Sequence, residues 1–241
     1  MNVSKIRISA VSYTNTKPFA FGIEHSELRD KIDLTYDIPS DCAQKLIDNK
    51  ADIGLVPVAA LLSIPNYHIL GDYCIGSVGA VNSVFIFSEK PIDQVKTIRL
   101  DPQSRTSNNL ARVLLKNYWK IPVEFVSEGE ADAFVEIGDR TFPHINTFPF
   151  SYDLGEQWLK FTGLPFAFAV WASNKPIAVE FVVELNRSLK FGVENIDTVL
   201  EELPKRKDFD LYDYFHNRLD FNLTEDKRSA INKYLQFVQE L

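Results

Sequence analysis

The sequence has few of the residues that build metal centres or disulfide frameworks. Its 241 residues include two cysteines, Cys42 and Cys74, and neither lies in a paired metal-binding or redox spacing. Such a pair is typical of buried thiols in a reducing compartment, although the spacing leaves a disulfide between them open. The four histidines are scattered and show no metal-binding helical spacing. We therefore expect no metal site.

Long hydrophobic runs and an excess of positive charge are also missing. No apolar run approaches the length of about 18 residues that a membrane-spanning helix needs. The first residues lead directly into an expected strand and contain no apolar signal-peptide core. The net charge of −7, from 26 basic and 33 acidic residues, argues against general nucleic-acid binding. We expect a cytoplasmic protein that binds neither nucleic acid nor membrane; the sequence carries no signal for an oligomeric state.

Short β-branched or apolar segments alternate with amphipathic ones along the whole chain. The apolar fraction of 45% is ordinary for a globular protein, and the chain is long enough to bury a sizeable core. This alternation predicts an α/β fold. The expected strands are residues 6–11, 32–38, 52–58, 67–73, 80–87, 95–100, 122–126, 131–137 and 166–171. The main expected helices are residues 42–50, 106–118, 178–195 and 224–241, with turns between, such as 74–79.

Two series of strands and helices follow one another with a similar layout. Ala-Asp pairs begin equivalent strands at positions 51 and 131. We expect two lobes, the first formed by residues 1–87 and 175–241 and the second by the inserted residues 88–174. A ligand would then bind between the lobes, where carboxyl ends of strands and helix N-termini converge.

Three corners between an expected strand and an expected helix carry polar side chains. Hydroxyl or amide groups there can cap the helix, and the unpaired N–H groups of its first turn can hold a carboxylate or phosphate. One corner alone is more typical of an ordinary capped helix, but three similar corners favour a shared anion site. The residues concerned are Asn15 and Thr16, then Ser40, then Arg105, Thr106 and Ser107, where Thr106 or Ser107 is the expected cap.

A polar pair, Asn82 and Ser83, interrupts the apolar strand expected at residues 80–87. Such residues lie at a sheet edge or point into a cleft, and Ser83 could equally satisfy backbone groups. Among the acidic residues, Asp153 precedes Leu-Gly and has the pattern of a turn or cap residue.

Four motifs occur in order between about residue 6 and residue 172. They are VSYTNTKP at 11–18, DIGLVPV at 52–58, LD with SRTS at 100–107, and DLG, Trp158, TGLPF and AVWA within 153–172. Together they resemble the chorismate dehydratase family of the futalosine route to menaquinone. The chain departs from that family's pattern at Thr14, where leucine is commoner, and at residues 140–143, where small apolar residues are expected.

The resemblance implies a two-lobed fold like that of type II periplasmic binding proteins, with the ligand cleft between the lobes. It also implies a carbon–oxygen lyase that removes water from chorismate without a cofactor, giving 3-[(1-carboxyvinyl)oxy]benzoate. The enolpyruvyl carboxylate of the substrate would take the ring proton. The catalytic residues would be Asn15, which orients the substrate, and Ser83, a hydrogen-bonding partner.

The expected substrate-binding residues supply hydroxyl groups and helix N-termini for the two carboxylates of chorismate. Arg105 could instead turn away and pair with Asp101. The expected set is Thr16, Ser40, Arg105, Thr106 and Ser107.

Two other functions remain open from the sequence. The first is that of a sister enzyme in the same pathway, the 1,4-dihydroxy-6-naphthoate synthase, which would be expected to place a histidine in the cleft. His144 is the candidate for that role. The second is a cytosolic protein that binds a small anionic solute without catalysis.

Overall fold

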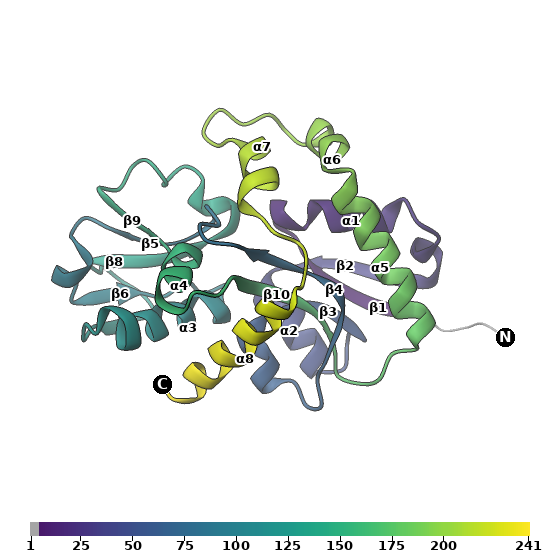
Figure 1. Ribbon diagram of the computed structural model, residues 1–241, viewed down its shortest axis with the longest axis horizontal. Coiled ribbons are helices and arrows are strands. Elements are labelled where there is room, and N and C mark those ends of the chain that lie inside the picture. The colour runs from purple at the N-terminus through teal and green to yellow at the C-terminus, as the bar shows by residue number, and fades with distance from the viewer. Residues whose placement is uncertain (1–4) are drawn as a thin grey trace.

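The computed structural model describes residues 5–241 and contains two five-stranded mixed sheets (Figure 1). In the first sheet, β1 pairs in parallel with both β2 and β3, and β10 is antiparallel to β3 and β4. The strand order of this sheet is β2(Ile32–Asp37), β1(Ile6–Val11), β3(Ile53–Pro57), β10(Phe166–Ser173) and β4(His68–Ser77).

The second sheet repeats this mixture of parallel and antiparallel pairing. Its central strand β8 is parallel to β6 and antiparallel to β5, and β5 also pairs antiparallel with β9. The strand order is β7(Glu124–Val126), β6(Thr97–Arg99), β8(Ala133–Ile137), β5(Val84–Ser88) and β9(Phe150–Asp153). We call each sheet with its packed helices a lobe, the first lobe containing β1 and the second lobe containing β8.

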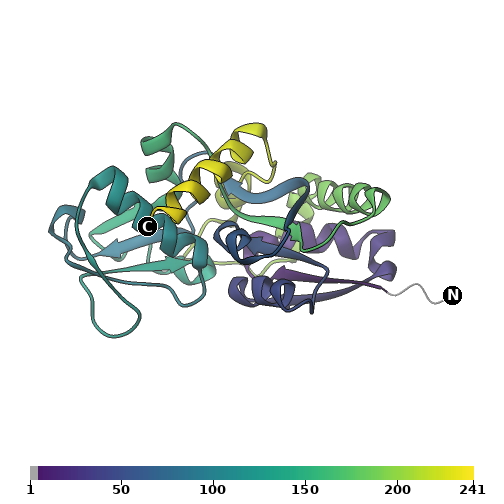
Figure 2. The ribbon, with the colours of Figure 1, turned by 90° about the horizontal axis from the view of Figure 1, so that it is seen from below.

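Helices cover both lobes and join them. In the first lobe, α1 packs on α5, and α2 packs on β3 and β1. The C-terminal helix α8 contacts both β10 and α3, so it spans the junction of the lobes (Figure 2). The longer helices are α1(Lys17–Glu24), α2(Pro39–Ile47), α3(Arg105–Val113), α4(Leu154–Thr162), α5(Val179–Glu194), α6(Ile196–Glu202) and α8(Glu225–Gln239). Shorter ones are η1(Thr14–Thr16), η2(Glu27–Lys31), η3(Val58–Ser63), η4(Ile92–Gln94), η5(Leu114–Trp119), η6(Gly138–Thr141), α7(Leu211–Asp213) and η7(Tyr214–Arg218).

The chain crosses between the lobes at places that differ from the sequence prediction. Strand β5, expected in the first lobe, belongs to the second sheet, and β10, expected within the second lobe, lies in the first sheet. The physical reason is that β10 is almost wholly apolar and buried, so it inserts between β3 and β4 instead of lying at an edge. The expected limits of 88–174 for the second lobe therefore leave out most of β5 at one crossing and wrongly include β10 at the other.

Two strands also have different ends from those predicted. Strand β4 continues to Ser77 through the expected turn, because Gly76 and Ser77 pair with β10. Strand β5 begins only at Val84, since Asn82 has the left-handed φ of 55° and cannot continue a strand. The late start of β5 leaves Ser83 just ahead of the strand, where the chain enters the second lobe.

Close contact between α1 and α5 fixes the start of the first lobe. A Cβ atom on Gly192 would lie 1.7 Å from the Pro18 carbonyl oxygen, and one on Gly22 would lie 1.9 Å from that of Ser188. Only glycine permits backbones to approach this closely. The segment η1 directly precedes α1, so this packing also places Asn15. No helix among residues 5–241 has the length and apolarity needed to cross a membrane.

Candidate functional site

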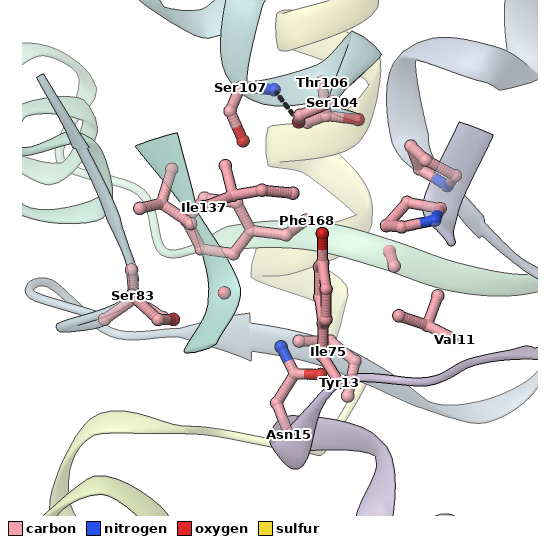
Figure 3. A pocket seen from close by; sticks show the side chains of 16 residues that line it. Val11, Tyr13, Asn15, Ile75, Ser83, Ser104, Thr106, Ser107, Ile137 and Phe168 are labelled. Atoms are coloured by element: carbon pink, nitrogen blue, oxygen red, sulfur yellow. Dashed lines mark hydrogen bonds between the residues drawn. The ribbon is translucent and has the colours of Figure 1, made fainter. Parts of the chain in front are cut away.

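A cavity lies between the two lobes, with about 60 Å³ of room for the centres of water-sized spheres inside about 530 Å³ of space that includes open solvent (Figure 3). Its walls are apolar, and its polar groups come from three places: η1 of the first lobe, the residue before β5, and the first turn of α3. The lining residues are Val11, Tyr13, Asn15, Pro39, Pro57, Ile75, Val81, Ser83, Val84, Ser104, Thr106, Ser107, Ile137, Gly138, Phe168 and Ala169.

The first turn of α3 forms the most polar wall. Ser104 is the N-cap, because its backbone is extended and its hydroxyl oxygen accepts a hydrogen bond from Ser107 N at 3.0 Å. The prediction that Thr106 or Ser107 caps this helix is therefore wrong: both already lie inside its first turn. The Thr106 hydroxyl oxygen accepts from Ala59 N at 3.0 Å, which joins the two lobes.

The hydroxyl group of Ser107 is available to bind a ligand. Its hydroxyl oxygen faces the cavity and has no hydrogen-bond partner among residues 5–241 (Figure 3). The start of an α-helix also carries unpaired N–H groups and the positive end of the helix dipole. This wall is therefore suited to a carboxylate group.

Asn15 faces this wall from the other side of the cavity. Its side-chain nitrogen points into the cavity, and its amide oxygen accepts a hydrogen bond from the Thr16 hydroxyl at 3.3 Å (Figure 3). Thr16 is buried and does not line the cavity, and its hydroxyl contacts Asn15. Thr16 occupies the N-cap position of α1, as expected, but its side chain makes no cap hydrogen bond.

Ser83 is hydrogen-bonded by Tyr214, a residue that the sequence did not indicate. The Tyr214 hydroxyl donates to Ser83 Oγ at 2.8 Å, and both residues are 1% exposed. The adjoining backbone is held by Asp153, whose Oδ2 accepts from the N–H groups of Val81 and Asn82 at 3.0 and 2.7 Å. No local pattern links positions 83 and 214, so only the fold could reveal this contact.

Asp153 has the structural role that its position suggested. Its other carboxylate oxygen caps α4 by accepting from Gly155 N and Glu156 N. Burial raises the pKa of Asp153 to about 6, although the four backbone N–H groups oppose this shift. Asp153 does not line the cavity. Its carboxylate links the first turn of α4 to the backbone of Val81 and Asn82, which precede Ser83.

Ser40 and Arg105 lie outside the cavity lining. The N-cap of α2 is Ile38, so Ser40 is the second residue of the helix and makes no cap bond, contrary to expectation. Asp101 pairs with Arg140 through a contact of 2.6 Å, so the alternative partner proposed for Arg105 is also wrong. The first turn of α2 meets the cavity through Pro39 instead.

Contacts between the two lobes flank the cavity at Tyr13 and Gly138, which both line it. The Tyr13 hydroxyl donates to the Gln103 side chain. The Thr14 hydroxyl donates to Asp139 Oδ2 at 2.8 Å, and Thr14 N approaches the same carboxylate. Gly138 has a φ of 65°, and a Cβ atom there would lie 2.8 Å from the Tyr13 ring. A larger residue at position 138 would therefore push the lobes apart.

No side chain in the lining is an acid or a strong base. Every polar lining side chain is a neutral hydroxyl or amide, and burial raises the pKa of Tyr13, which keeps it protonated. His144 lies elsewhere: it contacts Glu136 at 2.7 Å and packs against Phe87, Phe134 and Phe148. The histidine expected for the sister enzyme is thus not in the cavity.

Solved structures with the same arrangement define the class of fold. A structural-genomics protein from Archaeoglobus fulgidus matches with a TM-score of 0.73 at 16% identity, over 100% of this chain and 98% of that one. A Candida albicans protein described as having the generic periplasmic binding protein fold matches with a TM-score of 0.69 at 15% identity, over 99% and 91%. The chain therefore has the two-lobed periplasmic-binding-protein-like fold with its cavity between the lobes, as predicted.

Sequence relatives narrow the class to one family. Residues 6–240 match the family model described as menaquinone biosynthesis, and the chain belongs to that family. A curated relative from Thermus thermophilus, named chorismate dehydratase, is 24% identical over an alignment of 222 positions that covers 80% of this chain and 80% of the relative. The resemblance seen in the sequence motifs is confirmed at the family level.

Proposed function

We propose that this protein is a chorismate dehydratase, a carbon–oxygen lyase that converts chorismate to 3-[(1-carboxyvinyl)oxy]benzoate and water. The family and the Thermus thermophilus relative support this assignment. The observation that carries it is the cavity lining, in which Asn15 and Ser83 face the first turn of α3 between apolar walls. Such a site can orient a flat, polar-rimmed anion and has no side chain in its lining to act as a strong base.

A carboxylate of chorismate matches the polar wall at the first turn of α3, and its ring matches the apolar walls. One carboxylate would accept hydrogen bonds from the hydroxyl groups of Thr106 and Ser107 and from the first N–H groups of α3. The ring would lie against Phe168 and the neighbouring aliphatic side chains. Thr16, Ser40 and Arg105 are not assigned substrate contacts in this proposal, because they do not line the cavity.

The elimination then depends on the correct orientation of the substrate's own groups more than on an acid or a base from the protein. The ring carbon that bears the ether loses its proton to the enolpyruvyl carboxylate, the bond from the ring to the hydroxyl oxygen breaks, and the ring becomes aromatic. The hydroxyl leaves as water with the proton that the carboxylate took. Asn15 holds the side chain and the ring in the conformation that brings carboxylate and proton together. Positioning of this kind can supply about 7 kcal/mol or more of the barrier reduction.

The test is incubation of the purified protein with chorismate, with no cofactor added, followed by detection of the aromatic enolpyruvyl ether by chromatography and ultraviolet absorbance. We expect product well above the slow spontaneous decay of chorismate. Asn15→Ala should lower turnover by about a hundredfold or more, because the orienting amide is lost while the backbone is unchanged.

The matched control is Asn109→Ala, which removes an amide from α3 that does not line the cavity. This variant should retain full activity, and circular dichroism should show both variants folded. Chorismate that decays at its spontaneous rate with the unmodified protein would contradict the proposed function. Full activity of Asn15→Ala would contradict the role given to Asn15.

A further inference from the structure

The chain between α6 and η7 connects the two lobes on the side opposite α8. We call residues 203–214 the strap; Figure 1 shows its short helix α7 between α6 and the second sheet. Phe209 of the strap stacks on Phe142 of the second lobe, with ring centroids 3.7 Å apart. The Arg206 guanidinium lies 5.0 Å above the same ring. The strap is therefore anchored to the second lobe, and it ends at Tyr214.

Tyr214 is placed by three aromatic neighbours. Its ring makes edge contacts with Phe142, Phe209 and Phe215 at centroid distances of 5.7, 5.2 and 5.6 Å. These contacts fix the direction of the hydroxyl group, which is buried beside Ser83. The ring packing would survive removal of the hydroxyl oxygen alone, so the two contributions of Tyr214 can be separated.

The hydrogen bond from Tyr214 determines what the Ser83 hydroxyl can do. A serine hydroxyl has one proton to donate and can accept from other groups. Because Ser83 Oγ accepts the Tyr214 proton at 2.8 Å, its own proton must point in another direction. Ser83 Oγ has no other hydrogen-bond partner among the described residues, and Ser83 lines the cavity. The remaining direction for the proton is into the cavity.

We propose that Tyr214 is a positioning residue for the elimination: it fixes the Ser83 hydroxyl as a donor that points at the departing hydroxyl of the substrate. This inference rests on the proposed function. Ser83 stabilises negative charge on the departing oxygen and keeps its own proton. The water is completed by the proton that the enolpyruvyl carboxylate removed from the ring, so no group of the protein changes its protonation state.

The orientation is independent of pH in the working range. Burial raises the pKa of Tyr214 well above its ordinary value, and the hydrogen bond to Ser83 offsets only part of this shift. Tyr214 consequently remains a donor from about pH 6 to about pH 9. A change at Tyr214 should therefore lower turnover by the same factor across this range.

The test compares Tyr214→Phe, Ser83→Ala and the double variant in the chorismate assay. Tyr214→Phe should lower kcat by about tenfold, the effect of one lost buried hydrogen bond, with KM changed by less than about threefold. The double variant should have the activity of Ser83→Ala alone, because Tyr214 acts through Ser83. The control is Tyr152→Phe, which loses a bond of 2.8 Å from Ile92 N far from the cavity. Its kcat should be unchanged.

The outcomes separate this inference from the proposed function. An unmodified protein that neither converts nor binds chorismate would overturn both. If the unmodified protein converts chorismate normally, two results would overturn this inference alone. The first is an unchanged kcat in Tyr214→Phe. The second is a double variant whose loss of kcat equals the product of the two single losses. If Tyr214→Phe unfolded at a much lower temperature than Tyr152→Phe and lost activity only with its fold, a purely structural role would be shown and the inference would also fail.

Discussion

Neutral hydrogen-bonding groups have an advantage for a doubly charged substrate in a closed cavity. A buried cation would bind a carboxylate strongly, but it would have to be desolvated whenever the cavity closed without ligand. Hydroxyl groups and the first turn of a helix cost much less to bury and are already oriented. Ser107 is an example: its backbone N–H donates to the cap residue Ser104, while its hydroxyl group remains available to a ligand in the cavity.

Ser107→Ala should weaken substrate binding without destabilising α3. The cap bond uses the backbone N–H of Ser107, so α3 should keep its stability, while the cavity loses a hydroxyl donor for a charged oxygen. Hydrogen bonds to charged groups contribute about 1.5–3 kcal/mol, so KM for chorismate should rise by about tenfold or more. Ser104→Ala is the contrast, because it removes the cap and should lower the free energy of unfolding by about 1 kcal/mol. Unchanged substrate kinetics in Ser107→Ala would show that the carboxylate lies elsewhere.

Some of the site was predictable residue by residue and some was not. Asn15, Thr106 and Ser107 follow strands within a few positions, so strand ends and helix starts in the sequence place them at the cavity. Ser104 was missed as the cap because three hydroxyl residues compete within four positions, and backbone conformation decides among them. Tyr214 was missed because its partner lies 131 positions away and its ring looks like ordinary core.

At the scale of elements, boundaries were harder to predict than the elements themselves. The approach to β5 has the composition of a strand, yet residues 81 and 82 give their N–H groups to a carboxylate instead of a neighbouring strand. Similarly, β4 runs through glycine and serine because β10 lies beside it. In both cases tertiary contacts override local propensity.

The segment η1 also joins the lobes, and this predicts the effect of Thr14→Val. The change preserves side-chain shape but removes the hydroxyl that donates to Asp139 at 2.8 Å. Loss of about 1 kcal/mol from the closed arrangement should lower kcat/KM by about fivefold, because a smaller fraction of the protein would be closed around the substrate.

The matched variant is Thr14→Ser, which restores the hydroxyl and should restore kcat/KM. Small-angle X-ray scattering without ligand should give a larger radius of gyration for Thr14→Val than for Thr14→Ser. Equal radii and equal kinetics in the two variants would show that this bond does not hold the lobes together.

At the scale of the whole molecule, the cavity depends on two lobes that meet through a few polar bonds and through α8. Each lobe must therefore be rigid by itself. In the first lobe, three strand ends meet at Asp52, whose carboxylate accepts from Arg7 N, Nε and Nη2 and from Lys175 Nζ at distances of 2.6–3.1 Å. This cluster ties β1 and β3 to the segment after β10, at the end of the sheet away from the cavity.

The Asp52 cluster predicts how stability depends on pH. The Arg7 hydrogen bonds hold the pKa of Asp52 well below its ordinary value of 3.8, with Lys175 adding to the shift against the opposing effect of burial. A carboxyl group whose pKa is lowered by folding stabilises the protein above its unfolded-state pKa, and this stability is lost as pH falls through the folded-state value. Urea unfolding should therefore show the contribution of Asp52 in full at neutral pH and a progressive loss below about pH 4.

Asp52→Asn isolates this contribution. It should lower the free energy of unfolding at neutral pH by about 1 kcal/mol, a value limited by the partial exposure of Arg7 and Lys175, and should make the decline below pH 4 shallower. Asp33→Asn, an exposed carboxylate on β2, should follow the unmodified protein at every pH. Because Asp52 lies away from the cavity, chorismate turnover of folded Asp52→Asn should be unchanged. A parallel loss of turnover and stability would mean that the first lobe transmits strain from this cluster to Asn15.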